Sequence, residues 1–281
     1  MAIISGNNAD NALNGNAEDD RIVCHGGNDT INGNQGNDFT FWRYGDGDDI
    51  IEDGDHFDTA RFDGTDGPGD NIIIEDVIVG GNTFTRVSGD GFSLFSNLIS
   101  NVERTTVSGK AGDDAIDRLL GEFGKDILDG GARDDFLSDD EGDYALDGND
   151  GQDVLIGADG NDELNGGSGA LDILLGLDGY NQLNGQTGDV VMTAGAGNDV
   201  FVFTPNFNPD KVMDFEDGSD RLRFFKAGVS NITDLTISDL NGDLLISVTD
   251  APQNDVLLVG LAGAFLDPGD LVFLPSSETG F

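Results

Sequence analysis

The segment DGNDGQDVL (residues 147–155), directly followed by IGADGNDEL (156–164), holds two copies of one nine-residue pattern. In each copy a glycine lies four residues, and an aspartate two residues, before a leucine. This matches the nonapeptide G-G-x-G-x-D-x-U-x, in which U is a large apolar residue. The apolar position returns across residues 125–203, and this regular period predicts a solenoid of stacked coils. Its members are Leu128, Leu137, Leu146, Leu155, Leu164, Leu174 after a one-residue slip, Leu183, Met192 and Phe201.

The spacing also predicts the chemistry of each repeat. The last three residues, x-U-x, form a very short strand whose middle side chain points inward, and the first six form a turn. Glycine permits turn conformations that a side chain would forbid, so carbonyl oxygens can converge, and the aspartate adds a charged oxygen. Calcium is a hard cation that takes six to eight oxygen ligands. Because one coil contains two repeats, we expect Ca²⁺ ions between turns i and i+2.

A shorter array with the same period covers residues 5–40. Its apolar positions are spaced by nine residues, and the position two residues earlier is acidic in three of four repeats. The first repeat has Asn11 in place of the acid, and we read it as an atypical end that caps the array. The apolar positions are Leu13, Ile22, Ile31 and Thr40, and the acidic ones are Asp20, Asp29 and Asp38.

We expect the calcium ligands to be the carboxylates and turn glycines of both arrays. The predicted metal-binding residues are Asp20, Asp29, Gly33, Gly36, Asp38, Asp114, Asp126, Gly130, Asp135, Gly148, Gly151, Asp153, Gly157, Gly160, Asp162, Gly166, Asp172 and Asp199. No residue is predicted to be catalytic or to bind another cofactor.

Alternate turns lie on opposite flanks, and the two flanks differ. One flank has three consecutive acids and should hold two well-formed sites. The other alternates acids with non-acids, so its ions would have one carboxylate each or be missing. The first flank reads Asp135, Asp153, Asp172 and Val190, and the second reads Asp126, Tyr144, Asp162, Asn181 and Asp199.

These repeats resemble the RTX (repeats-in-toxin) haemolysin-type calcium-binding family. The resemblance implies an all-β fold, a right-handed parallel β-roll or β-solenoid, with several Ca²⁺ ions along both flanks. The C-terminal part is similar to the cap and uncleaved export signal of many RTX exoproteins, through D-x-F-x-F (199–203), D-F-x-x-G-x-D (214–220) and LVFLPSSETGF (271–281). This implies the type I secretion machinery as a partner and an extracellular, bacterial location.

The pattern divides the chain into four expected parts. Residues 1–51 form a first repeat array and residues 111–203 a second β-roll. Between them, residues 52–110 contain NIIIEDVIV, TFTRVS and FSLFS, which favour an antiparallel or irregular β-rich insert. Residues 204–281 form a β cap and secretion segment, with a hairpin expected at Asn241–Gly242.

Composition excludes several classes of function. The 281 residues include 55 Asp and Glu against 13 Lys and Arg, a formal charge of −42. This argues against nucleic acid and against attraction to anionic lipid. A single cysteine, Cys24, permits no internal disulfide. The start MAIISGNNAD has no signal-peptide pattern, and no apolar run is long enough to span a membrane.

No enzyme signature is present, and we expect no catalytic activity. The sequence lacks H-E-x-x-H and G-x-S-x-G, and its two histidines, His25 and His56, lie in separate turns. Many acidic side chains will lie close together, but in so acidic a sequence we interpret them as metal ligands and not as catalytic pairs.

Three functions remain open. The favoured one is a secreted protein that folds on extracellular calcium and has a structural, cell-surface or interaction role. The second is a non-catalytic polysaccharide-binding companion of an alginate-epimerase-like enzyme, for which Arg43, Arg61, Arg86 and Arg104 offer only scattered basic charge. The third is a membrane-active, pore-forming exoprotein, which no amphipathic or apolar helical segment supports.

Overall fold

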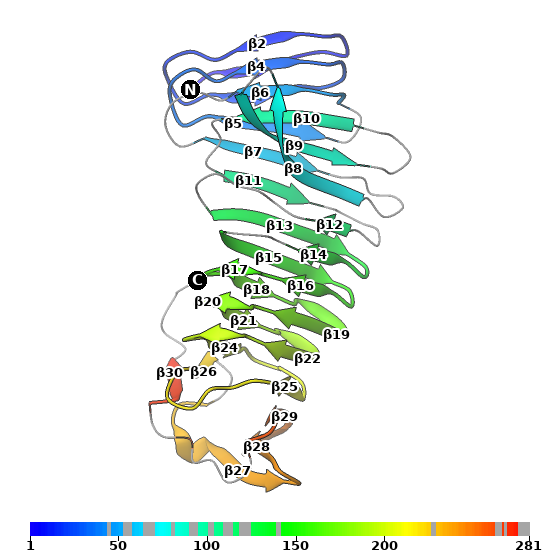
Figure 1. The fold of residues 1–281 in the computed structure, drawn as a ribbon. Helices are drawn as coiled ribbons and strands as arrows, with labels where there is room; N and C mark the ends of the chain where they lie inside the picture. Colours follow the sequence, from blue (N-terminus) through cyan, green and yellow to red (C-terminus); the bar gives the residue numbers. More distant parts are fainter. Residues whose placement is uncertain are drawn as a thin grey trace. The chain divides into compact units, whose positions relative to one another are not determined.

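The chain folds as two compact units of short β-strands, Met1–Ala145 and Leu146–Phe281 (Figure 1). The predicted all-β, parallel β-roll is confirmed. The described part of the chain contains no helix with the length and apolar character that a bilayer crossing requires. The computed structural model describes residues 1–43, 46–52, 58–63, 71–79, 82–89, 95–100, 104–108, 115–117, 125–138, 142–225, 229–261, 266 and 269–274.

The first unit has one fully parallel sheet. Its strands stack one coil upon the next, so that Ile4 pairs with Ile22 and Ile22 with Thr40, each 18 residues further along the chain. Two nonapeptides therefore make one coil, as the spacing predicts. In order, the strands are β1 (Ile3–Ser5), β3 (Arg21–Val23), β5 (Phe39–Arg43), β7 (Thr59–Asp63), β11 (Arg104–Ser108) and β13 (Lys125–Ala132).

The second sheet of this unit is interrupted by antiparallel strands. β8, β9 and β10 form an antiparallel meander, and parallel strands continue on both of its sides. The β-rich insert thus joins the ladder of the coils by its two outer strands. In order, the strands are β2 (Ala12–Asn14), β4 (Thr30–Asn32), β6 (Ile50–Glu52), β10 (Phe95–Ser100), β9 (Asn82–Gly89), β8 (Asn71–Val79), β12 (Ala115–Asp117) and β14 (Phe136–Ser138).

The second unit repeats the parallel arrangement on two faces. One face runs through β16 (Val154–Ile156), β19 (Ser168–Leu175), β22 (Thr187–Thr193), β25 (Asp210–Val212) and β29 (Ala251–Leu258). The other runs through β18 (Glu163–Asn165), β21 (Gln182–Asn184), β24 (Val200–Phe203), β26 (Arg221–Phe225) and β30 (Leu271–Leu274). β15 (Asp143–Asp150) precedes them, and a small ladder along the turns links β17 (Asp159–Gly160), β20 (Asp178–Gly179) and β23 (Ala196–Gly197).

The predicted apolar positions form the core. Leu155 pairs with Leu174 and Leu174 with Met192, and all three side chains are fully buried. Each coil contributes only two such side chains, so the layer between the faces is thin. At about 25 cal/mol per Å² of buried apolar area, a core of this kind gives limited stability against the entropy of ordering the turns.

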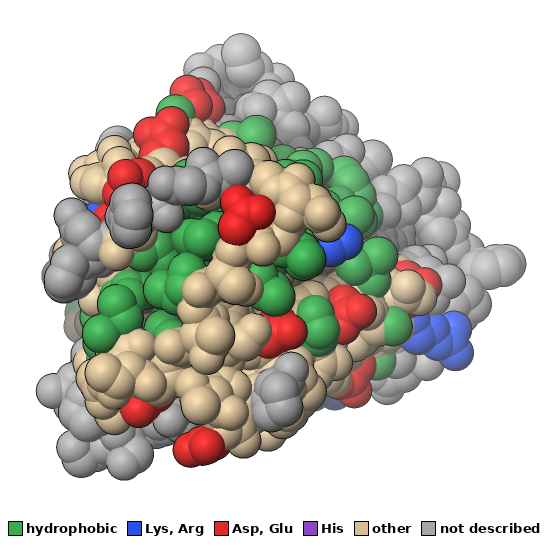
Figure 2. Space-filling view, turned by 90° about the horizontal axis from the view of Figure 1, so that it is seen from below, with side chains coloured by type: hydrophobic (Ala, Val, Ile, Leu, Met, Phe, Trp, Pro, Cys, Tyr) green, Lys and Arg blue, Asp and Glu red, His purple; other side chains and the backbone are tan. Residues whose placement is uncertain are grey.

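The C-terminal end of the second unit has a larger apolar core and a hairpin. The rings of Phe203 and Phe224 stack with centroids 5.2 Å apart. β27 (Leu235–Leu240) and β28 (Asp243–Val248) are antiparallel, and Asn241 and Gly242 both have positive φ, which confirms the predicted turn. A single 3₁₀ turn, η1 (Ile232–Asp234), precedes them. Figure 2, seen from below, shows apolar side chains gathered between acidic ones.

Candidate metal centres

In the first unit the turn aspartates form hydrogen-bonded ladders. The backbone N–H of Asp20 donates to Oδ1 of Asp38 at 2.8 Å, and that of Asp38 donates to Oδ1 of Asp58 at 2.7 Å. On the other flank the N–H of Asp29 donates to Oδ1 of Asp49 at 2.8 Å. Each carboxylate therefore ties its own coil to the coil before it.

The second unit has the same ladders, and an amide takes one place. The N–H of Asp153 donates to Oδ1 of Asp172 at 3.0 Å. On the other flank the N–H of Asp162 donates to Oδ1 of Asn181, and the N–H of Asn181 donates to Oδ1 of Asp199 at 2.7 Å. Asn181 thus replaces the carboxylate as hydrogen-bond acceptor but brings no charge.

The second carboxylate oxygen of these residues lies in a space that glycine leaves open. A Cβ added to Gly130 would lie 2.5 Å from Oδ2 of Asp135, and one added to Gly157 would lie 2.6 Å from Oδ2 of Asp162. Any side chain there would occupy the carboxylate's place. The same cradle lies beside Oδ2 of two further carboxylates, at Gly148 for Asp153 and at Gly166 for Asp172.

Other turn glycines bring successive turns into backbone contact. Gly36 has a φ of +120°, and a Cβ there would lie 2.5 Å from the carbonyl carbon of Glu18 in the preceding coil. A Cβ on Gly15, Gly169 or Gly179 would collide with the carbonyl oxygen of the glycine one coil away. Those three carbonyls belong to Gly33, Gly151 and Gly160.

Three of the carboxylates have an oxygen that is buried and has no hydrogen-bond donor. These atoms are Oδ2 of Asp29, Asp172 and Asp199. A buried carboxylate oxygen without a donor is costly, because its charge has lost the solvation of water. At Gly166 the cradle has the chemistry of a cation site, because a Cβ there would lie 2.8 Å from the unsatisfied Oδ2 of Asp172 and 3.2 Å from the carbonyl oxygen of Gly185.

Burial also shifts the titration of the turn aspartates. It is the main cause that raises the pKa of Asp49 to about 7, of Asp199 to about 6 and of Asp210 to about 8, and neighbouring carboxylates act in the same direction. Asp20 is an exception, since two backbone N–H groups lower its pKa. Carboxyls with raised pKa values hold protons near neutral pH unless a cation replaces them.

The structure brings most of the predicted ligands together in this way. Asp114 lies outside the described residues, and only the backbone of Asp126 is described, within β13. The other predicted aspartates are all buried, namely Asp20, Asp29, Asp38, Asp135, Asp153, Asp162, Asp172 and Asp199, and of these Asp172 lies within β19.

Four ladder aspartates and one thiol were not predicted from the sequence. Asp49 and Asp58 follow their partners by 20 residues instead of 18, because residues have been inserted in these coils. Asp210 and Asp220 extend the ladders of the second unit by accepting the N–H groups of Val190 and Asp199.

The sequence signal that could have identified these aspartates is the triplet D-x-U, which is kept despite the insertions. Asp49 lies two residues before the buried Ile51, and Asp220 lies two residues before the buried Leu222. The thiol is Cys24, which occupies the position that Gly130, Gly148 and Gly157 have in other turns.

Fold and site together define a parallel β-roll whose turns are built to take cations. Comparison with known families agrees: the RTX calcium-binding nonapeptide repeat (4 copies) matches residues 5–39, 105–137, 120–143, 145–170 and 172–203. These residues are calcium-binding repeats of the RTX family. A search among curated proteins found no match.

Two solved structures are similar to the chain. One is the extracellular lipase LipA from Serratia marcescens, with 20% identity and a TM-score of 0.35, covering 92% of this chain and 39% of the lipase. The other is the AlgE6R3 subunit from the Azotobacter vinelandii mannuronan C5-epimerase, with 24% identity and a TM-score of 0.35, covering 54% of this chain and 86% of that subunit. The chain thus spans well under half of the lipase.

Proposed function

We propose that this protein is a secreted RTX protein whose coils close on extracellular calcium, with a structural, cell-surface or interaction role and no reaction of its own. The proposal rests above all on the donor-free, buried Oδ2 atoms of Asp172 and Asp199. An ordered chain cannot keep such oxygens charged and dry without a cation. Export by a type I system and an extracellular location belong to the same proposal.

Several Ca²⁺ ions would be held by the predicted carboxylates together with carbonyl oxygens of the turn glycines. Calcium supplies charge neutralisation here, and its binding free energy adds to the free energy of folding. The formal charge of −42 adds repulsion between the stacked turns, which the ions would offset. On the first flank, Asp135, Asp153 and Asp172 would give the best sites. On the second, Asn181 would weaken the site that it shares.

Because folding depends on bound calcium, the calcium concentration of the compartment would decide whether the chain is folded. Extracellular calcium modules bind with dissociation constants of about 10⁻⁴–10⁻³ M, far above the free calcium of a cell. Inside, the chain would remain expanded and suited to export, and outside it would fold.

The test is calcium-dependent folding of the full chain. Far-UV circular dichroism in chelator should be coil-like, and millimolar calcium should produce a β spectrum, whereas magnesium at the same concentration should not. A β spectrum that is equally strong in chelator at neutral pH would overturn the proposal.

A second candidate function is binding of an acidic polysaccharide. β3 and β5 place Arg21 beside Phe39, with the guanidinium 5.4 Å from the ring centroid, and Arg43 lies 4.9 Å from the ring of Phe41. Five of the chain's basic residues lie on strands of the first sheet of the first unit, namely Arg21, Arg43, Arg61, Arg104 and Lys125. Arginine above aromatic rings suits uronate polymers, because it offers paired donors to carboxylates beside a flat apolar surface.

Binding of polyuronate to calcium-loaded protein tests this candidate. Arg21→Ala with Arg43→Ala should remove most of the affinity, and Lys211→Ala, which removes an exposed charge from the second unit, should not. Equal binding by all three proteins, or equal binding of a neutral glucan, would exclude the candidate.

A further inference from the structure

Cys24 stands at the position of the nonapeptide that leaves space for the carboxylate. It precedes Asp29 by five residues, as Gly130 precedes Asp135 and Gly157 precedes Asp162. At those glycines a Cβ would come within 2.6 Å of the aspartate's Oδ2. A side chain at position 24 is therefore directed at the carboxylate of its own turn.

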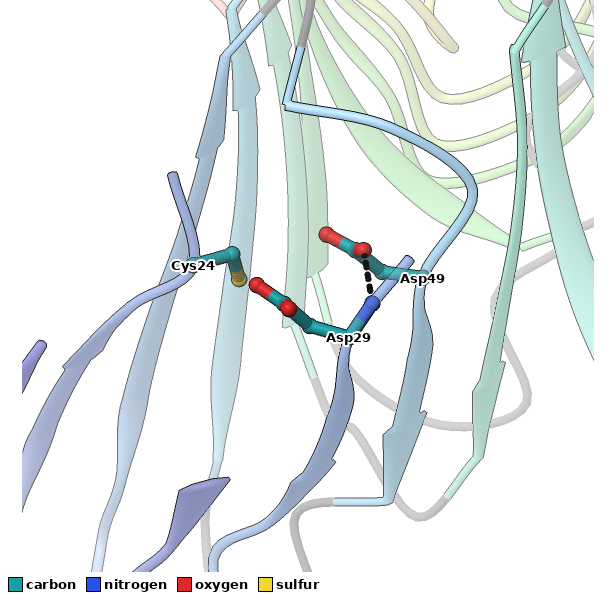
Figure 3. A group of neighbouring side chains, drawn as sticks. All are labelled: Cys24, Asp29 and Asp49. Carbon is teal, nitrogen blue, oxygen red and sulfur yellow. Dashed lines mark hydrogen bonds between the residues drawn. The ribbon is translucent and has the colours of Figure 1, made fainter. Parts of the chain in front are cut away.

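The thiol completes a buried cluster with two aspartates (Figure 3). The Sγ atom of Cys24 and one carboxylate oxygen each from Asp29 and Asp49 all lie within 4.8 Å of one another, and all three residues are buried. In Figure 3 the carboxylate of Asp29 points toward the sulfur, while Asp49 approaches from the next coil. The three groups thus face one common point.

The cluster is held in place and has an unsatisfied oxygen. Oδ1 of Asp29 accepts the N–H of Asn11 at 2.8 Å, and Oδ1 of Asp49 accepts the N–H of Asp29 at 2.8 Å. These bonds fix both carboxylates. Oδ2 of Asp29 remains buried without a hydrogen-bond donor. The neighbouring His25 is engaged elsewhere, since its Nε2 lies 3.0 Å from Oγ of Ser5.

We propose that Cys24, Asp29 and Asp49 form a site for a thiophilic divalent cation of the zinc class, distinct in preference from the calcium turns. Calcium takes oxygen ligands only, whereas a thiolate selects softer metals such as Zn²⁺. One sulfur and two carboxylates give three ligands, and zinc commonly completes its four-coordinate sphere with water. Metal binding would release the thiol proton to solvent as the sulfur–metal bond forms.

Cadmium and cobalt are the probes for this site. The calcium-loaded full chain should bind one Cd²⁺ with the ultraviolet thiolate-to-cadmium charge-transfer band and one Co²⁺ with tetrahedral visible bands, and Zn²⁺ should displace both. Because Cys24 is the chain's single cysteine, a thiolate band reports on this residue alone. A folded chain without either spectrum would overturn the proposal.

Matched variants decide whether the aspartates take part. Asp49→Asn should weaken Cd²⁺ binding by at least about tenfold. Asp48→Asn, which changes the exposed neighbour, should leave it unchanged. Equal affinities for the two variants would mean that the thiol binds without the cluster and would sink the site.

Cys24→Gly separates this site from calcium folding. The variant restores the glycine of the pattern, so it should lose the cadmium band but keep its calcium-induced β spectrum. A wild-type chain that folds with calcium yet gives no cadmium band would refute only the thiol site. A chain that does not respond to calcium would refute the proposed function instead.

Discussion

The backbone N–H of Asp153 donates a hydrogen bond of 3.0 Å to Oδ1 of Asp172, one coil further along the chain. The other oxygen of Asp172, Oδ2, is buried, has no donor, and lies 2.8 Å from where a Cβ on Gly166 would be. One carboxylate therefore has two roles. Oδ1 joins two coils, and Oδ2 needs a cation.

These two roles can be separated by substitution at Asp172. Asp172→Asn keeps an oxygen for the N–H of Asp153 but removes the charge, so the calcium concentration at the folding midpoint should rise. Asp172→Ala removes both, and at saturating calcium it should cost a further 1–3 kcal/mol, roughly, for the unsatisfied N–H. Calcium titration by circular dichroism and urea unfolding measure the two effects.

The control is Asp159→Ala, which removes an exposed carboxylate from a neighbouring turn. It changes the net charge by the same amount and should leave the midpoint nearly unchanged. Shifts of equal size at Asp159 and Asp172 would mean that general charge repulsion, and not a site, controls folding.

Asn181 offers the opposite experiment. Its Oδ1 already accepts the N–H of Asp162, at 3.0 Å, so Asn181→Asp should preserve the ladder and add one anionic oxygen. We expect tighter calcium binding and one more ion per chain by isothermal titration calorimetry. In chelator the variant should need a lower pH than the wild-type chain to gain β structure, because the new charge is buried near Asp199. Unchanged stoichiometry would argue that this flank does not bind calcium.

Where the nine-residue period is regular, the sequence predicted both the buried apolar residues and the aspartates that precede them. Leu155 and Leu164 lie in the core, and Asp153 and Asp162 are buried two residues before them, because the nine-residue spacing fixes both. Asp49 and Asp58 were not predicted, because inserted residues lengthen their coils and the nine-residue period no longer locates the aspartates. Both aspartates keep the ladder hydrogen bond despite the insertions.

The cysteine could not be predicted as a ligand for a different reason. Whether Cys24 can be a metal ligand depends on the direction of its Cβ. That direction becomes clear only from the structure, which shows that a Cβ at the equivalent positions Gly130 and Gly157 would point at the aspartate carboxylate. From the sequence, Cys24 is a lone thiol. In the fold, it faces Asp29 and Asp49, and Asp49 belongs to a repeat that the period alone does not reveal.

The requirement for glycine beside the aspartate carboxylate can be tested by adding a methyl group at the glycine. A Cβ on Gly148 would lie 2.6 Å from the carbonyl oxygen of Gly166 and would collide with Oδ2 of Asp153. Gly148→Ala should therefore destabilise the calcium-loaded protein by about 1–3 kcal/mol, as overpacking does, and weaken calcium binding. Urea unfolding at saturating calcium is the measurement.

Gly26→Ala is the matched control. The nearest atoms to a Cβ there, on Asn8, lie at 3.6–3.7 Å, an ordinary contact distance. This variant should be neutral or slightly stabilised through the unfolded chain. If both substitutions cost the same, backbone conformation and not the cradle would explain the requirement for glycine.

Protons should partly replace calcium. In the ion-free fold, burial raises the pKa of Asp199 to about 6, of Asp49 to about 7 and of Asp210 to about 8. The unfolded chain has carboxyl pKa values of about 3.9, so from there up to the folded pKa values the native state binds more protons. These three groups therefore add most to the stability of the ion-free protein below about pH 4, and their contribution is lost as pH rises toward 8.

Calcium affinity should increase as pH rises, because calcium ions must displace these protons. We expect chelated protein to gain β structure on acidification from pH 8 to 5, and the calcium midpoint to fall as pH rises over the same interval. Asp210→Asn keeps an acceptor for the N–H of Val190 and removes the group with the highest of these pKa values. It should flatten the upper part of the profile, between about pH 6 and 8. A calcium midpoint independent of pH in the wild-type chain would show that the buried carboxylates are ionised before calcium arrives.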